Sequence, residues 1–282
     1  YIRQKKRDRT ELSTYSLQDF HNRYVKYKLL ERVTKDDDTL LDIAVGKGGD
    51  LHKWTNLKLS FVLGQDISQD GLIDPVNGAC VRYLSLIRDK RVYPNVFFVW
   101  GDSSQRISTG DSALDKLNKY YLDVLYGNIG REMVLNKHLH KFWGIAKEQF
   151  NVVSAQFAIH YFFKDSDTFK GFLKNIEDNV KPNGHFIGTC LDGSTLFSKL
   201  QKTKTGRIGK VLATEDIGIK KTGKKEKKDK QFIWYIKRQF EKSSEFKADM
   251  SSLGMKVDVY IDSINRVYEE YLVNFDYFTE QM

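Results

Sequence analysis

Short apolar runs alternate with amphipathic stretches along this chain. The runs, which are rich in Val, Leu, Ile and Phe and therefore predict buried β-strands, lie at 39–45, 59–66, 95–100, 150–157 and 185–189. Stretches that predict helices lie at 14–32, 74–90, 165–179 and 194–202. This alternation of strand and helix predicts an α/β fold with a doubly wound, mostly parallel sheet.

Three regions fall outside that alternation. Residues 1–35 predict an N-terminal helical extension, and residues 203–263 a lysine-rich region of strands and loops. Residues 103–149 are too long for an ordinary strand-to-helix connection, so we interpret them as a helical insertion. We expect residues 1–282 to form a single domain that includes all three.

The first predicted strand ends in a glycine-rich turn, Gly46-Lys47-Gly48-Gly49, and Asp50 then begins a helix. A strand, glycine turn and helix start is where α/β sheets bind adenosine-containing ligands. A dinucleotide fingerprint would place its third glycine at Leu51, which disfavours a nicotinamide-dependent enzyme. The alternative is a turn that merely connects strand to helix.

Acids follow the next two predicted strands. Asp66 lies 20 residues after Gly46, the spacing of an acid that accepts hydrogen bonds from ribose hydroxyls. Asp102 and Ser103 follow the third strand, where an acid can accept from an adenine amino group. Each acid could instead start an ordinary turn. Because parallel strands end at one edge of the sheet, the three features together predict a nucleoside pocket.

The form of the glycine turn resembles motif I of S-adenosylmethionine-dependent methyltransferases. Three further segments, Gln156–Phe163, Gly184–Thr189 and Glu270–Val273, are similar to the mRNA cap guanine-N7 methyltransferases, above all to those within multifunctional capping enzymes of large DNA viruses. The resemblance covers about residues 18–275. It implies a Rossmann-like class I methyltransferase fold and methyl transfer from S-adenosyl-L-methionine to guanine N7 of an mRNA cap, leaving S-adenosyl-L-homocysteine.

The resemblance also implies roles for individual residues. The methyl donor would be bound by Lys26, Ala44, Gly46, Asp66, Asp102, Ser103, Gln156 and Tyr161. The cap would be bound by Asn22, Lys47, Lys53, Phe157, His160, Tyr161 and Glu270, with the two lysines at its phosphates. Glu270, His160 and Tyr161 would position the guanine, and no general base is implied because N7 carries a free lone pair.

Each assigned role has a simpler alternative, and the chain departs from the family in places. Phe157 and His160 could be core residues, Glu270 a charge at a strand edge, and Lys26 a solvated helix lysine. Ala44 stands where the family has glycine, and Leu191-Asp192 replaces Pro-Asn. Family members continue past the position of Met282, so we expect a domain excised from a longer capping enzyme.

The net charge of +9 is concentrated at two places. Residues 1–9 hold five Lys or Arg and one acid, and residues 220–230 hold seven lysines and two acids. These segments suit a polyanion such as RNA, although they could equally be solvated surface. Two cysteines, Cys80 and Cys190, are too few for a disulfide framework. His138 and His140 lack partners at metal-ligand spacing, so we expect a surface helix there and no metal.

The expected partner is the capped 5′ end of RNA, and no apolar run approaches the ~20 residues that span a membrane. The sequence leaves open whether guanylyltransferase and triphosphatase domains share the polypeptide, and whether a stimulatory subunit is needed. The resemblance implies action in the cytoplasm, and in a viral factory or virion if the source is viral. The rival functions are methylation of a protein or small molecule, and a catalytically weak module that binds RNA or a partner.

Overall fold

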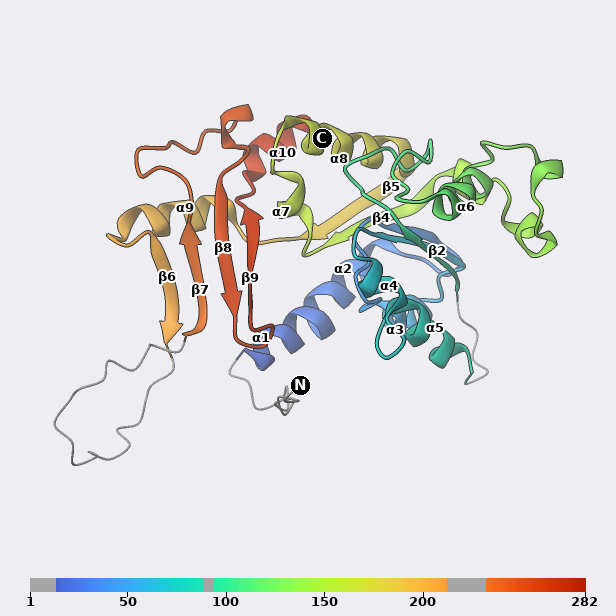
Figure 1. The fold of residues 1–282 in the computed structure, drawn as a ribbon, viewed down its shortest axis with the longest axis horizontal. Helices are drawn as coiled ribbons and strands as arrows, with labels where there is room; N and C mark the ends of the chain where they lie inside the picture. Colours follow the sequence, from blue (N-terminus) through green and yellow to red (C-terminus); the bar gives the residue numbers. More distant parts are fainter. Residues whose placement is uncertain (1–13, 89–93, 212–231) are drawn as a thin grey trace, which may run out of the picture.

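A computed structural model describes residues 14–88, 94–211 and 232–282 of the chain. The two basic segments, 1–9 and 220–230, lie outside the described residues, as do parts of the expected 1–35 extension and 203–263 region. Figure 1 shows the two sheets around which the described part is built.

The larger sheet has five parallel strands in the order β3-β2-β1-β4-β5. They are β1 (Thr39–Asp42), β2 (Phe61–Asp66), β3 (Asn95–Trp100), β4 (Phe150–Gln156) and β5 (Val180–Thr189). The central strands β1, β2 and β4 are almost wholly buried, which explains why they are continuous apolar runs rather than alternating ones. The prediction of a doubly wound, mostly parallel sheet is confirmed.

Helices cover both faces of this sheet. They are α3 (Leu51–Asn56), α4 (Gln69–Ile73), α5 (Ala79–Ile87), α6 (Lys116–Tyr126), α7 (Ile159–Phe162), α8 (Ser166–Asn179) and α10 (Phe275–Gln281). One apolar core joins the sheet to α6, α8 and α10 through a group of stacked phenylalanines, among them Phe172 and Phe278. A second core joins the other face to α3 and α5, through residues such as Trp54 and Ala79.

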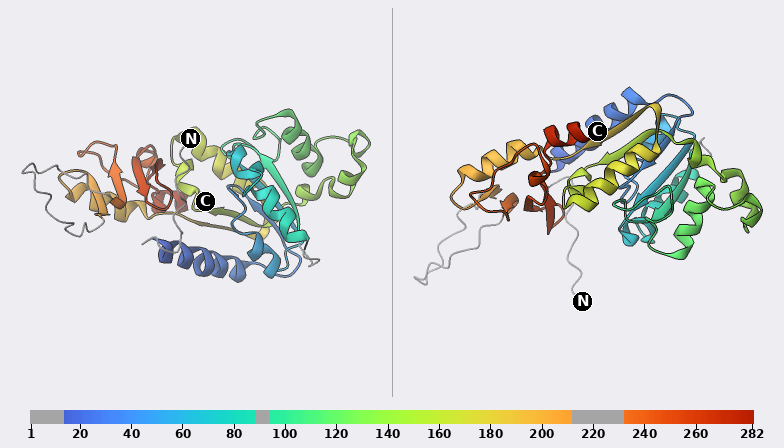
Figure 2. Two further views of the ribbon diagram at one scale, coloured as in Figure 1. Left: turned by 60° about the horizontal axis from the view of Figure 1, so that its bottom comes forward. Right: turned by 90° about the horizontal axis from the view of Figure 1, so that it is seen from above.

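The N-terminal helical segment 14–32 is confirmed as α1 (Tyr15–Asp19), a π-helical turn η2 (Phe20–Val25) and α2 (Lys26–Val33). Leu30 enters the second core, and Figure 2 shows this segment and α8 on opposite sides of β5. At its other end, Thr14 donates a hydrogen bond to Asp262 and Gln18 one to Ser263. The segment therefore spans from the larger sheet to the smaller one.

The smaller sheet is antiparallel, with the order β6-β7-β8-β9. Its strands are β6 (Arg207–Val211), β7 (Phe232–Arg238), β8 (Lys256–Ile261) and β9 (Arg266–Tyr271). One face packs on α9 (Gly193–Lys202), with Leu200, Ile236 and Val259 in the shared core. The sequence predicted strands in this region but not that they form a separate sheet, which stands beside the larger one in Figure 1.

Some predicted boundaries were wrong. The first strand ends at Asp42 rather than at 45, where the Asp42 carboxylate accepts a hydrogen bond from the Ala44 N–H, although the Ile43 and Val45 N–H groups still donate to Ser154 and Gln65 of the neighbouring strands. The helix predicted at 74–90 is shorter than expected: only α5 (Ala79–Ile87) is helical, and residues 74–78 form a turn in which the Asp74 side chain accepts from the Val76 and Asn77 N–H groups. Residues 89–90 of that prediction lie outside the described residues.

The expected 103–149 insertion contains α6 and the 3-10 helices η3 (Arg131–Met133), η4 (Lys137–Phe142) and η5 (Ile145–Glu148). A further 3-10 turn, η6 (Met250–Ser252), precedes β8. His138 and His140 lie on η4, where His140 Nε2 contacts the Val134 carbonyl at 2.8 Å. No cluster of His, Cys, Asp or Glu that could hold a metal ion occurs within 14–88, 94–211 or 232–282.

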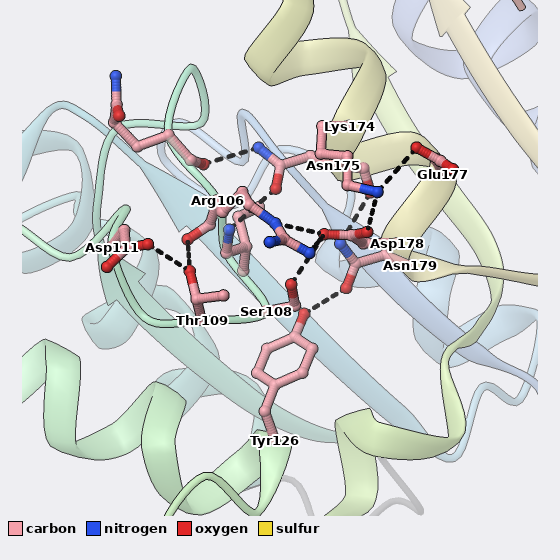
Figure 3. Close-up of polar contacts among 12 residues, drawn as sticks. Arg106, Ser108, Thr109, Asp111, Tyr126, Lys174, Asn175, Glu177, Asp178 and Asn179 are labelled. Carbon is pink, nitrogen blue, oxygen red and sulfur yellow. Dashed lines mark hydrogen bonds and ion pairs between the residues drawn. The ribbon is translucent and has the colours of Figure 1, made fainter.

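Helix α8 fixes the chain that follows β3 (Figure 3). The Asn175 amide group donates to the carbonyls of Ser103 and Gln105, at 2.9 and 2.8 Å. Its own carbonyl accepts from the Ile107 N–H at 2.9 Å. Asn175 is fully buried, and its bonds to Ser103 and Ile107 satisfy buried backbone groups, while the bond to the exposed Gln105 is partly buried. Together these bonds position the segment that begins with Asp102.

A surface ion-pair network reinforces the same connection (Figure 3). Asp178 on α8 lies 2.8 Å from Arg106 and 3.0 Å from Lys174, and it accepts from the Ser108 hydroxyl at 3.0 Å. Such partly exposed pairs contribute little stability individually. The hydrogen bonds of Asn175 therefore contribute more than the ion pairs of Asp178 to holding this segment in place.

We expect Asn175→Ala to lower the free energy of unfolding by about 3 kcal/mol, because it leaves two buried backbone groups and one partly buried group without their partner, at roughly 1–3 kcal/mol for each buried group and without full additivity. Urea denaturation followed by circular dichroism would measure this. Asn56→Ala, at an exposed helix end, is the matched control and should change stability by less than about 0.5 kcal/mol. A loss below about 1 kcal/mol for Asn175→Ala would show that α8 does not hold this segment.

Candidate functional site

The glycine turn after β1 adopts a backbone that favours glycine. Gly46 and Gly48 have φ of +55° and +65°. A Cβ atom on Gly48 would lie 2.9 Å from Leu51 Cδ1, so glycine is also needed there for the helix to pack closely. Beside Gly46 no atom lies within 4 Å of such a position, which leaves space for a ligand against the backbone.

Asp66 is held against this turn. One carboxylate oxygen accepts from the Gly46 N–H at 2.6 Å and the other from the Ser68 N–H at 2.8 Å. Burial raises the pKa of Asp66, while these two hydrogen bonds act in the opposite direction. Asp66 is only half-buried, so the structure brings together the acid and the glycine turn as the sequence predicted.

Asp102 and Ser103, which follow β3, differ in how deeply their side chains are buried. Asp102 is half-buried and accepts from the Ser104 N–H at 2.9 Å. The Ser103 hydroxyl is buried, donating to the Ile43 carbonyl at 2.6 Å and accepting from Gln65 at 2.8 Å. Its hydroxyl therefore joins β1, β2 and β3, and only its backbone remains for a ligand.

A buried ionic group, here called the Asp50 cluster, joins the N-terminal segment to the start of α3. It comprises Asn22, Lys26, Asp50 and Lys53. Asp50 lies 3.1 Å from the Lys26 ammonium and 2.8 Å from that of Lys53. Lys53 also donates to the Asn22 side chain at 3.0 Å. These charges lie directly beside the glycine turn.

Electrostatics in the Asp50 cluster oppose the effect of burial. Desolvation by itself would raise the pKa of Asp50, but Lys26 and Lys53 outweigh it and hold that pKa below its usual range. Asp42 has no such cation in contact, and burial together with the Asp50 charge raises its pKa to about 7. One buried carboxylate is thus ionised, while its neighbour takes up a proton at a pH near 7.

The third part of the site is an aromatic–acid cluster, comprising Phe157, His160, Tyr161 and Glu270. The His160 ring lies 5.7 Å from that of Phe157 and 4.2 Å from that of Tyr161. Phe157 and Tyr161 remain 39% and 45% exposed although they adjoin the core, so they offer aromatic surface to a ligand. Phe157 has a φ of +59°, a strained conformation of the kind that concentrates at functional sites.

Glu270 and His160 are buried with few polar partners. Neither ring nitrogen of His160 has a hydrogen-bond partner, and Nε2 lies 3.7 Å from the Glu270 carboxylate. Burial lowers the pKa of His160 to about 4 and raises that of Glu270 to about 7. The imidazole is therefore neutral, and the contact is neither an ion pair nor a hydrogen bond. His160 thus holds two unsatisfied, enclosed nitrogens beside a largely buried carboxyl group.

Tyr161 connects the aromatic–acid cluster to the glycine turn. Burial raises the pKa of Tyr161 to about 12, and the charges of both Glu270 and Asp66 contribute. The hydroxyl thus lies within the field of one acid from each pocket. Gln156, at the end of β4, donates to Ser154 at 3.2 Å and accepts from Thr189. A ligand at the glycine turn and another at the aromatic–acid cluster would adjoin one another.

Lys47 and Lys53, which were expected at the cap phosphates, make other contacts in the structure. Lys47 is exposed and its ammonium contacts Asn77, with Arg82 donating to its backbone carbonyl at 2.8 Å. No contact joins it to the aromatic–acid cluster in the described part of the chain. Lys53 is buried and committed to Asp50 and Asn22, so its clearest role is to place Asn22.

Sequence reasoning missed three residues of this site. Asp50 was treated only as a helix start, yet it binds two cations. His21 and Thr189 form a hydrogen bond of 3.1 Å between the N-terminal segment and β5. Thr189 ends a segment that carries the family resemblance, but the sequence contains no signal that pairs it with His21, because the two residues are 168 positions apart.

The glycine turn, the two strand-end acids and the parallel sheet define a class I, Rossmann-like S-adenosylmethionine-dependent methyltransferase fold. Residues 2–282 match the family described as mRNA (guanine-N(7))-methyltransferase domain, and the chain belongs to this family.

Relatives with known names agree with this assignment. A protein of Acanthamoeba polyphaga mimivirus named "Probable mRNA-capping enzyme" is 28% identical over 64% of this chain and 14% of its own length. The mRNA cap guanine-N(7) methyltransferase 1 of Arabidopsis thaliana is 27% identical over 76% of this chain and 50% of its own. This chain therefore spans half or less of these relatives.

Among solved structures, the CcbJ methyltransferase of Streptomyces caelestis aligns with 98% of this chain and 79% of its own, at a TM-score of 0.49 and 12% identity. A S-adenosylmethionine-dependent methyltransferase of Clostridium acetobutylicum aligns with 97% and 80%, at a TM-score of 0.43 and 16% identity. Within the described ranges, no helix is long and apolar enough to span a membrane.

We expect Glu270→Gln to stabilise the protein above neutral pH. The folded state holds the Glu270 proton up to about pH 7, whereas the unfolded chain releases it near 4.5, so ionisation destabilises the fold increasingly between these values. The amide cannot ionise and should gain up to about 3 kcal/mol over wild type at pH 8, and little at pH 4.

Urea denaturation at pH 4, 6 and 8 would measure this difference. Glu269→Gln is the matched control, since Glu269 is exposed on the same strand and pairs with Lys256. If the two variants showed the same pH dependence, the carboxyl of Glu270 would not be desolvated in the folded protein.

Proposed function

We propose that this domain transfers a methyl group from S-adenosyl-L-methionine to N7 of the guanosine cap of mRNA. The observation that carries the proposal is the buried Glu270 carboxyl, which lies 3.7 Å from His160 and acts electrostatically on the half-exposed Tyr161, as does Asp66 at the glycine turn. A guanine ring presents N–H donors at N1 and N2, which such a carboxylate accepts. Family membership supports the same substrate.

In the proposed donor site, Asp66 accepts from the ribose hydroxyls and Asp102 from the adenine amino group. Lys26, already beside the glycine turn, faces the donor's carboxylate, and Gln156 and Tyr161 line the pocket. Gly46 and Ala44 bring backbone close to the ligand, and the half-buried Ala44 leaves its methyl group at the pocket rather than in the core. The Ser103 hydroxyl supports the pocket from behind.

In the proposed acceptor site, Phe157 and Tyr161 pack on the purine, while Glu270 holds its N1 and N2 edge and His160 limits its position. Asn22, whose carbonyl is turned toward Lys53, offers its exposed amide N–H groups to the cap. Lys47 and Lys53 supply positive charge near the cap phosphates.

The chemistry needs little beyond alignment. When bound, S-adenosyl-L-methionine supplies an electrophilic methyl group on a sulfonium. Guanine N7 already has a lone pair, so no residue has to remove a proton. Glu270 in its ionised form balances the positive charge that grows on the purine, and the rings hold N7 in line.

Transfer can be tested with radiolabelled S-adenosylmethionine and unmethylated GpppA-capped RNA, followed by nuclease P1 digestion. We expect labelled m7GpppA. Label at a ribose would refute the acceptor site but retain the donor site. Donor binding without any transfer to caps, but with transfer to peptides or small amines, would favour the alternative substrate. Absence of donor binding would favour a catalytically weak module for RNA or a partner.

Mutations in the proposed donor site and in the proposed acceptor site should have distinct effects. Glu270→Ala should lower kcat/KM for capped RNA by about 10²–10³-fold and leave donor affinity unchanged. Asp66→Ala should weaken donor binding by roughly 10–100-fold, because it removes charge-assisted hydrogen bonds. Isothermal titration with S-adenosylhomocysteine and steady-state kinetics measure the two effects. Equal losses of donor binding in both variants would refute the separation.

In this proposal the domain binds the capped 5′ end of RNA. It acts in the cytoplasm, or in a viral factory or virion if the source is viral. The mimivirus relative supports a viral capping context. Guanylyltransferase and triphosphatase domains on the same polypeptide, and a stimulatory subunit, remain predictions.

A further inference from the structure

The π-helical turn η2 determines the relative directions of His21 and Lys26 in the N-terminal segment. Lys26 N–H donates to the His21 carbonyl, a bond between positions five apart. In an α-helix, positions five apart point roughly 140° away from each other, whereas the wider π turn brings them much closer to alignment. His21 can therefore face the sheet while Lys26 faces Asp50, and π turns of this kind are frequent at functional sites.

His21 contacts the end of β5 through the Thr189 hydroxyl. His21 Nε2 lies 3.1 Å from Thr189 Oγ1, and the His21 ring is half-buried. The same hydroxyl donates to the Gln156 side-chain carbonyl at 3.2 Å and accepts from the Phe157 N–H at 3.0 Å. With its proton donated to Gln156, the hydroxyl can accept from His21 in the tautomer that carries the proton on Nε2.

This arrangement holds Phe157 from two sides. The His21 ring meets the Phe157 ring edge-on at 5.4 Å, and the His160 ring meets it edge-on at 5.7 Å. The Phe157 backbone is fixed by bonds from its N–H to both the carbonyl and the hydroxyl of Thr189. A strained residue with φ of +59° keeps its conformation only when its surroundings determine it in this way.

We propose that His21 and Thr189 form a positioning pair that fixes the Phe157 ring and fastens the N-terminal helical segment over the purine pocket. This inference rests on the proposed function. It assigns the pair to recognition of the cap purine rather than of the methyl donor. The pair acts through Phe157 and touches no substrate itself.

The test uses variants that separate the ring from the hydrogen bond. His21→Phe keeps an aromatic edge against Phe157 but loses the bond, and His21→Gln keeps a donor without the ring. Thr189→Val removes the hydroxyl, and Thr189→Ser restores it. His185→Phe and Thr195→Val, at exposed positions without a side-chain hydrogen bond in the described part of the chain, are the matched controls.

We expect His21→Phe and Thr189→Val each to raise KM for GpppA-capped RNA about tenfold, with kcat and S-adenosylhomocysteine affinity within about threefold of wild type. The double variant should be no worse than either single variant, since both remove the same bond. Thr189→Ser should return KM to within about threefold of wild type, and His21→Gln should recover part of the loss.

Several outcomes would overturn the inference. They are an unchanged KM in His21→Phe and Thr189→Val, multiplicative losses in the double variant, and donor affinity falling as much as cap affinity. If the wild type methylates caps and the variants match it, this inference alone fails. If the wild type neither binds nor methylates GpppA, the proposed function fails and the inference with it.

Discussion

The site depends on one buried carboxylate held between two lysines. Asp50 begins α3, and its contacts with Lys26 and Lys53 fasten the N-terminal helical segment to the glycine turn. Burying three charges is costly unless each is paired, so this group stabilises one relative placement of helix and sheet more than it adds net stability. With Lys26 fixed, the π turn determines where Asn22 and His21 lie.

In the aromatic–acid cluster, burial determines the pKa values, whereas ion pairing determines that of Asp50. Both Glu270 and His160 are buried, the two ring nitrogens of His160 have no hydrogen-bond partner, and the pKa values of both groups shift toward the neutral forms. Together with the strained Phe157 backbone, this marks a surface whose free energy falls when a ligand supplies the missing hydrogen bonds. Strain and desolvation occur together at the place where the sequence predicted a purine.

The smaller sheet contributes one residue to the aromatic–acid cluster. It carries Glu270 on β9, while Phe157, His160 and Tyr161 follow β4 of the larger sheet. The N-terminal segment contacts both sheets, through Thr14 and Gln18 at one end and Leu30 at the other. The aromatic–acid cluster therefore draws its residues from both sheets, and the N-terminal segment contacts both.

The sequence by itself determined the parallel sheet, the glycine turn and the strand-end acids Asp66 and Asp102, because these are local patterns: apolar runs, a spacing of 20 residues, and a backbone conformation that favours glycine. It also indicated Glu270 and the Phe157–Tyr161 stretch, through resemblance to a family. Only the tertiary structure decided that Glu270 is borne by a second sheet and that Lys53 is committed to Asp50. It alone revealed the contact of His21 with Thr189. Contacts between residues far apart in sequence depend on how whole elements pack, and neither periodicity nor spacing along the chain encodes that packing.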